Sequence, residues 1–92
     1  MKKPYLITYD LNTPGKKYDK IIELIKGDLS SAWCKYLESA FLITSNYTPQ
    51  QILEKLKPHL DVNDRMIIIE VVNNKSGLLT TKQWNWINEN IF

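Results

Sequence analysis

The chain has 92 residues, of which 43% are hydrophobic and 24% charged, and its formal net charge at pH 7 is +2. This composition is typical of one ordinary globular domain, residues 1–92, with no room for a second core. So small a net charge does not by itself indicate a nucleic-acid partner, because binding follows local clusters of charge. The single cysteine, Cys34, excludes an intrachain disulfide, and with one histidine, His59, no zinc site of the usual kind can form within one chain.

The sequence gives no indication of a membrane partner. No segment approaches the ~20 consecutive apolar residues that a helix needs to cross a bilayer. The apolar run behind Lys2 and Lys3 is too short for a signal peptide. We therefore expect a cytoplasmic protein, and the lone cysteine fits a reducing compartment.

The first predicted element is an apolar run over residues 5–10 that ends abruptly in a carboxylate, Asp10. β-branched and aromatic residues dominate the run, and turn-forming residues follow at 12–15, so it is predicted to be a strand. Because both of its faces are apolar, a central place in the sheet is expected. Asp10 then lies where the strand leaves the sheet, either as the start of an Asx-type turn or as a chemical group.

A helix is predicted over residues 17–26, where Tyr18, Ile21, Ile22 and Ile25 recur at helical spacing and form one apolar stripe. Gly27 is well suited to end it.

The region from residue 32 to residue 44 is rich in apolar residues and contains no usual turn dipeptide. Lys35 and Glu38 interrupt the apolar pattern near its middle. We predict a short strand at 33–36, a tight reversal or bulge, and a second strand at 38–44.

Two further helices have clear start signals. Thr48 with Gln51, and Thr80 with Gln83, have the spacing of capping boxes. The first helix is predicted to stop near residue 58 and the second to run to about residue 90. Between them, residues 66–72 form an almost unbroken apolar run, which predicts a strand buried on both sides.

The predicted order is β-α-β-β-α-β plus a C-terminal helix, which is the ferredoxin-like plan of the α+β class. In this plan the two main helices cover one face of an antiparallel sheet. The strands at 5–10 and 66–72 are apolar on both faces, and an open apolar face normally marks an interaction site. We therefore expect a homodimer packed sheet to sheet, with the C-terminal helix covering what remains.

Lysines gather where a nucleic acid could be bound. Lys16, Lys17 and Lys20 lie at the first turn of the predicted helix, where free backbone N–H groups also attract phosphate. Lys35 is a further candidate for the same patch. The alternative interpretation is an ordinary solvated helix face.

Several of these residues resemble the CRISPR-associated Cas-two family. The matching features are the strand end at residues 9–11, the lysines six and seven positions after Asp10, residues 39–41 (Ser-Ala-Phe) and the helix led by Thr-Pro. The order of elements over residues 5–72 is also similar. Small Cas-two-like proteins outside CRISPR loci, some labelled SinR-family, resemble the chain around residues 36–39 and in its Trp-containing tail. The VapD-like toxin ribonucleases share the same general fold.

The resemblance implies a ferredoxin-like homodimer that handles DNA or RNA. In some members the aspartate that ends the first strand is proposed to bind a divalent metal together with its mate across the dimer. Others bridge the CRISPR integrase subunit and bind duplex DNA. By position, Asp10 would then bind Mg²⁺ or Mn²⁺, Tyr9 and Ser39 would lie beside it in a catalytic site, and Lys16 and Lys17 would contact phosphate.

The chain departs from the family in two ways. It has lysines where arginines are common, and its tail is predicted to be helical where many members end in a strand exchanged with the partner. The second departure counts against docking of an integrase subunit.

Three function classes follow. A nucleic-acid-binding or adaptor module needs only the lysine patch, and we favour this class. A metal-dependent endonuclease needs Asp10 from two chains, because a single carboxylate does not hold Mg²⁺ firmly. A structural protein-interaction module needs neither feature.

Overall fold

The computed structural model describes residues 2–11 and 16–92, with the side chains of 16–18 left out. The turn predicted at 12–15 lies outside these residues. The described chain forms a four-stranded antiparallel sheet and three α-helices, so the predicted α+β class is confirmed. Its elements are β1 (Lys3–Asp10), α1 (Lys16–Lys26), β2 (Ala32–Leu37), β3 (Ala40–Ser45), α2 (Pro49–Leu56), the 3-10 helix η1 (Lys57–His59), β4 (Arg65–Glu70) and α3 (Thr81–Asn90).

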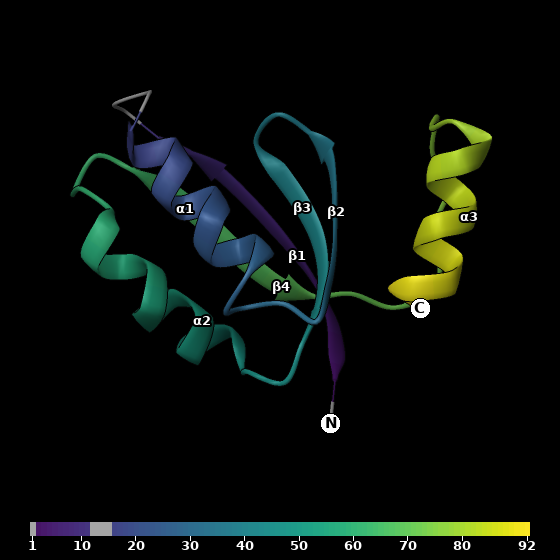
Figure 1. Ribbon diagram of the computed structural model, residues 1–92, viewed down its shortest axis with the longest axis horizontal. Helices are drawn as coiled ribbons and strands as arrows, with labels where there is room; N and C mark the ends of the chain where they lie inside the picture. The colour runs from purple at the N-terminus through teal and green to yellow at the C-terminus, as the bar shows by residue number, and fades with distance from the viewer. Residues whose placement is uncertain (1, 12–15) are drawn as a thin grey trace.

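The strands lie in the order β2-β3-β1-β4, and each neighbouring pair is antiparallel (Figure 1). β1 is a central strand, as its apolar sequence predicts. Ile7, for example, lies opposite Phe41 of β3 on one side and Ile68 of β4 on the other. The two edge strands are β2 and β4.

Helices α1 and α2 cover one face of the sheet, and α3 lies on the other side (Figure 1). The main core fills the space between the sheet and the first two helices, which is where the apolar stripe of α1 points. Its largest contributors from the strands and helices are Tyr5, Ile7, Tyr9, Phe41, Ile43, Ile21, Ile25, Ile52 and Leu56.

α3 covers only the β2 and β3 half of the second face. Ile87 of α3 is fully buried, and Trp84 lines a cavity together with Tyr36 of β2 and Leu42 of β3. The sequence predicts that the C-terminal helix covers part of this face, and the contacts of α3 with β2 agree with that prediction.

The other half of this face, formed by β1 and β4, is apolar and accessible. We call it the open half-face; it consists of Leu6, Thr8, Ile67 and Ile69. Ile67 is 56% exposed and Ile69 48% exposed. The prediction that the last strand is buried on both sides is therefore wrong for the single chain. The strand also ends earlier than predicted, at Glu70, and Val72 is exposed.

The reversal between β2 and β3 lies at residues 38 and 39, so β3 begins two residues later than predicted. The register between the strands shifts between Lys35 and Leu37. A bulge of this kind takes up one extra residue on one strand and moves the turn along the chain. The composition predicts a reversal or bulge in this region but does not fix its position.

Both predicted capping boxes are confirmed. At α2 the Thr48 hydroxyl accepts from the Gln51 amide at 3.1 Å, and the Gln51 side chain accepts from the Thr48 amide at 2.8 Å. Thr80 and Gln83 make the equivalent pair at α3, at 3.1 and 3.0 Å. Each box satisfies two backbone donors that the helix itself cannot.

The cap of α3 provides a stability test with a neighbouring control. Thr80→Ala is expected to lower the free energy of unfolding by about 1 kcal/mol, because the Gln83 amide loses its acceptor. Thr81→Ala, one residue inside the helix, is expected to change it by less than about 0.5 kcal/mol. Urea denaturation of both variants measures the difference, and equal losses would contradict a capping contribution from Thr80.

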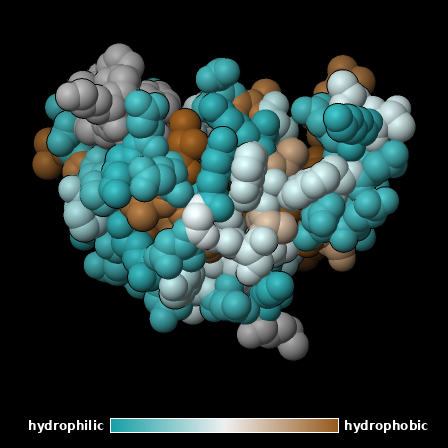
Figure 2. All heavy atoms as spheres, in the orientation of Figure 1, coloured by the Kyte–Doolittle hydropathy of each residue, from teal (hydrophilic) through white to brown (hydrophobic). Residues whose placement is uncertain are grey.

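The outward surfaces of α1 and α2 are mostly hydrophilic in the view of Figure 2. None of the helices in the described chain combines the length and apolar character that a membrane crossing requires.

Candidate nucleic-acid interface

The candidate site lies at the end of β1, where Asp10 is exposed. Leu6, Thr8 and Asp10 alternate with the core-facing residues of β1, so Asp10 lies at one end of the open half-face. The register of β1 and β4 sets Asp10 opposite Arg65. A shallow hollow of about 290 Å³ lies here, lined by residues 8–10 and 65–67.

Arg65 is held in place by the turn that precedes β4. Its Nη1 donates to the carbonyl oxygens of Val62, at 3.1 Å, and Asp64, at 3.0 Å. The guanidinium is thus held at the turn that precedes β4, at the same end of the sheet as Asp10. Our sequence interpretation did not identify Arg65 as a site residue, because its position opposite Asp10 depends on the register of two strands that are distant in sequence.

Tyr9 has a structural role in positioning the site. Its ring is buried and stacks on Phe41, with ring centroids 6.4 Å apart. Its hydroxyl donates to the carbonyl of Glu38 at 3.3 Å, and its amide donates to the carbonyl of Ser39 at 3.1 Å. The structure thus brings Tyr9 and Ser39 together, and their catalytic role beside Asp10 stays a prediction. The Tyr9 ring lies on the helix-covered face, however, whereas Asp10 lies on the opposite face.

Among the described residues, Asp10 has too few oxygen ligands around it to hold Mg²⁺ firmly within one chain. Asp10 supplies the only carboxylate among the residues lining the hollow, and the cationic Arg65 is its neighbour across the strands. The described residues also contain no group of three or more His, Cys, Asp or Glu side chains able to hold a metal ion. Mg²⁺ prefers six oxygen ligands in octahedral geometry. Asp10 of a second copy would supply a further carboxylate for Mg²⁺ or Mn²⁺.

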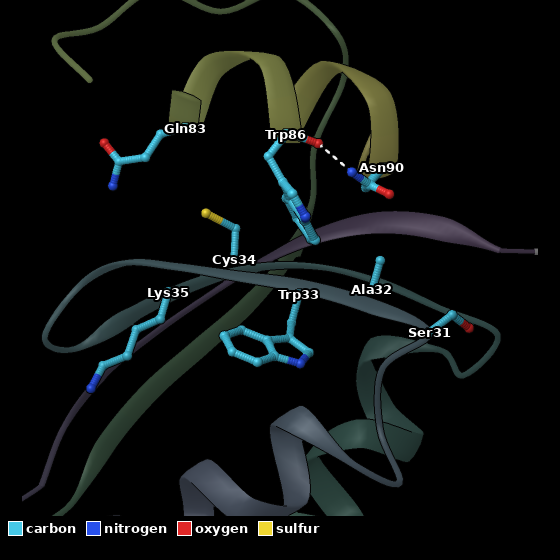
Figure 3. A pocket seen from close by; sticks show the side chains of 8 residues that line it. All are labelled: Ser31, Ala32, Trp33, Cys34, Lys35, Gln83, Trp86 and Asn90. Carbon is cyan, nitrogen blue, oxygen red and sulfur yellow. Dashed lines mark hydrogen bonds between the residues drawn. The ribbon is translucent and has the colours of Figure 1, made fainter. Parts of the chain in front are cut away.

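Two of the predicted lysines, Lys20 and Lys35, lie on the α1 side of the sheet. α1 begins at Lys16, close to the predicted start, but the side chains of Lys16 and Lys17 lie outside the described residues. Lys20 is exposed on α1, with its Nζ 3.9 Å from a Glu23 carboxylate oxygen. Lys35 points to the α1 side of the sheet (Figure 3), 3.7 Å from Glu38. The structure therefore does not bring Lys35 and Asp10 to the same face.

Cys34 lies half-buried between the sheet and α3 (Figure 3). Burial raises the pKa of its thiol. Burial also raises the pKa of Tyr36, with a smaller contribution from the charge of Cys34. A raised thiol pKa reduces the thiolate fraction at neutral pH, so Cys34 is poorly suited to act as a nucleophile.

The geometry at the end of β1 therefore combines an exposed carboxylate, an anchored guanidinium and an adjoining apolar face. The helix that follows β1 begins with two lysines. Comparison with known proteins adds no assignment to this arrangement, because no protein-family model and no curated protein matches the chain.

Proposed function

We propose that the chain is a cytoplasmic, nucleic-acid-binding homodimer of the Cas-two-like kind, acting as a binding or adaptor module on a ferredoxin-like fold. The strand order β2-β3-β1-β4, with antiparallel neighbours and α1 and α2 on one face, supports the ferredoxin-like plan.

The observation that carries the homodimer is the open half-face. Two isoleucines of one strand, Ile67 and Ile69, are about half exposed beside Leu6 in a domain of only 92 residues. Burial of apolar surface is worth about 25 cal/mol per Å², and small domains bury a low fraction of their surface on their own. A second copy offers the same apolar patch, so self-association removes both from water. It also brings the Asp10 ends of two chains into one assembly.

Exposed cations of the chain support a nucleic-acid partner. Arg65 is exposed at the end of the half-face, and Lys20 is exposed on α1. The start of a helix attracts phosphate through its free N–H groups and its dipole. The exposed Lys20–Glu23 pair, at 3.9 Å, contributes little free energy and does not prevent Lys20 from binding phosphate.

The metal-dependent endonuclease is the weaker alternative. It needs two Asp10 carboxylates close together, whereas each chain offers one, with Arg65 as its partner in the strand register. A cation at this end of the sheet favours phosphate binding over metal binding, so we favour the adaptor function.

A salt titration of DNA and RNA binding tests the proposal. Each phosphate that a lysine neutralises releases counterions, so affinity should fall steeply with salt. Lys16→Ala/Lys17→Ala should weaken binding and flatten the logarithmic slope by about one per lost contact. The control Lys75→Ala/Lys82→Ala removes two exposed lysines at α3, on the other side of the sheet from α1, and should leave the slope unchanged.

Cleavage assays in Mg²⁺ and Mn²⁺ separate the alternatives. The adaptor function predicts binding without cleavage, and Asp10→Ala should retain or slightly strengthen binding, because it removes a charge that repels phosphate. Cleavage by the natural chain that Asp10→Ala abolishes would establish the endonuclease instead. Absence of binding even at low salt would contradict both and favour the protein-interaction module.

A further inference from the structure

The free edge of β2 runs along a groove between the sheet and α3. The groove has a volume of about 580 Å³ and is lined by residues 31–35 on the strand side. Gln83, Trp86 and Asn90 of α3 line the opposite side (Figure 3). Within the described chain, β2 pairs only with β3. We call this feature the edge groove.

The antiparallel ladder determines which backbone groups of β2 face the groove. The Tyr9 amide of β1 donates to the carbonyl of Ser39, the residue before β3. Backbone groups of successive residues in a strand point to opposite sides, so the odd-numbered residues of β3 direct theirs to β1. The even-numbered residues of β3 direct theirs to β2. The Ser31 amide, which donates to Thr44 at 2.8 Å, agrees with this assignment. The β2 residues opposite Leu42 and Thr44 therefore face β3. Trp33 and Lys35 alternate with these residues along β2. Their N–H and C=O groups therefore point to the free edge.

The two sides of the edge have different chemistry. Trp33 and Lys35 project to the α1 side (Figure 3), where the Lys26 ammonium lies 4.5 Å from the Trp33 ring centroid. On the α3 side, Cys34 presents a small side chain and the half-exposed Trp86 projects from α3 toward the strand. One side is thus cationic, and the other presents the aromatic Trp86 alongside the uncharged side chains of Gln83 and Asn90.

We propose that the edge groove binds an extended segment of a partner protein, which adds to β2 as a fifth, antiparallel strand. Main-chain hydrogen bonds to Trp33 and Lys35 supply the pairing, as in other complexes formed by strand addition. Because side chains of a strand alternate between faces, the segment carries acidic residues toward Lys26 and Lys35 and apolar residues toward Trp86.

Charge decides between this occupant and a second copy of the chain. Pairing of β2 with β2 of a second copy would bring Lys26 and Lys35 together with the same lysines on one side of the sheet, and like charges across strands are destabilising. An acidic segment instead neutralises them. Glu38, whose carboxylate is 3.7 Å from the Lys35 ammonium, is fully exposed, and such pairs hold a lysine only weakly. The groove is also separate from Asp10, so this proposal does not depend on nucleic-acid binding.

A synthetic peptide that alternates Val and Glu, about six to eight residues long, is a suitable probe. Labelled with fluorescein and titrated with the full chain, it should bind, whereas the matched peptide of Val and Lys should not. Directly opposed residues of an antiparallel pair share a face, so the Glu residues of the bound peptide are those that hydrogen-bond to Trp33 and Lys35. N-methylation of the Glu residues should therefore weaken binding by more than about tenfold. N-methylation of the Val residues should leave binding nearly unchanged.

Hydrogen exchange locates the bound peptide. In the free protein the amides of Trp33 and Lys35 should exchange quickly, and the amide of Cys34 should exchange slowly. The peptide should slow the first two. Lys35→Glu is expected to weaken peptide binding at least about twofold, because it reverses a charge that faces the peptide. Lys57→Glu, on η1, should leave peptide binding unchanged.

Three results would overturn the proposal. The first is no binding at millimolar peptide, and the second is binding that is equally sensitive to N-methylation of Glu and of Val. The third is slow exchange of the Trp33 and Lys35 amides in a homodimer without peptide. A second copy of the chain would then occupy the groove.

Discussion

Leu56→Ala is expected to lower the free energy of unfolding by about 2–5 kcal/mol. Leu56 is fully buried at the end of α2, where it packs in the core between the helices and the sheet. The change removes apolar contacts and leaves a cavity that the surrounding side chains fill only in part. Domains of this size have about 5–15 kcal/mol of stability in total, so the variant should lose a large share of it.

Leu78→Ala is the matched control, because the same atoms are removed from a side chain that is completely exposed. It should change the free energy of unfolding by less than about 0.5 kcal/mol. Urea denaturation followed by circular dichroism measures both variants. Similar losses at the two positions would mean that the packing of α2 against the sheet does not stabilise the fold as described.

The helices could be predicted well from the sequence because their signals are local. Thr48 with Gln51 and Thr80 with Gln83 form hydrogen bonds within one turn, and no distant contact is needed to recognise them. The apolar stripe of α1 likewise follows from the helical period. β1 lies between β3 and β4. This central place is expected, because its sequence does not alternate apolar with polar residues.

The faces of the strands could be predicted less well. An apolar strand pattern does not show whether a face is covered by a helix of the same chain, by a second chain or by nothing. Ile67 and Ile69 are as hydrophobic as Ile68, yet only Ile68 packs against the main core. The difference arises because α1 and α2 cover one face and α3 reaches only half of the other.

Only part of the candidate site follows from the sequence. Asp10 is expected at the end of the first strand, and β1 ends at this exposed residue. Arg65 does not follow from the sequence, because only the register of β1 against β4 sets it opposite Asp10. Lys35 is predicted to extend the lysine patch at the start of the first helix, and its side chain lies on the α1 side of the sheet. The side chains of Lys16 and Lys17 lie outside the described residues, so the patch stays a prediction. The edge groove depends on the docking of α3, which no local pattern predicts.

Two neighbouring residues of β4 separate the proposed homodimer from the fold itself. Ile67 is 56% exposed on the open half-face, whereas Ile68 is half-buried and packs against the main core. An aspartate at position 68 would place a carboxylate against apolar side chains, and such a change destabilises folding. An aspartate at position 67 would remain accessible to water in the single chain.

We therefore expect Ile67→Asp to weaken self-association at least about 100-fold while the fold is retained. Two like charges that face each other across an interface cost several kcal/mol, and about 1.4 kcal/mol corresponds to a factor of ten. Sedimentation equilibrium at micromolar concentration should give twice the chain mass for the natural protein and the single mass for this variant, with thermal unfolding by circular dichroism as the check on folding.

Ile68→Asp should instead lower the melting temperature. Val62→Asp, at a position 91% exposed in the turn before β4, should change neither property. A natural protein that sediments as a monomer, or an Ile67→Asp variant that still sediments as a dimer, would show that the open half-face is not the interface.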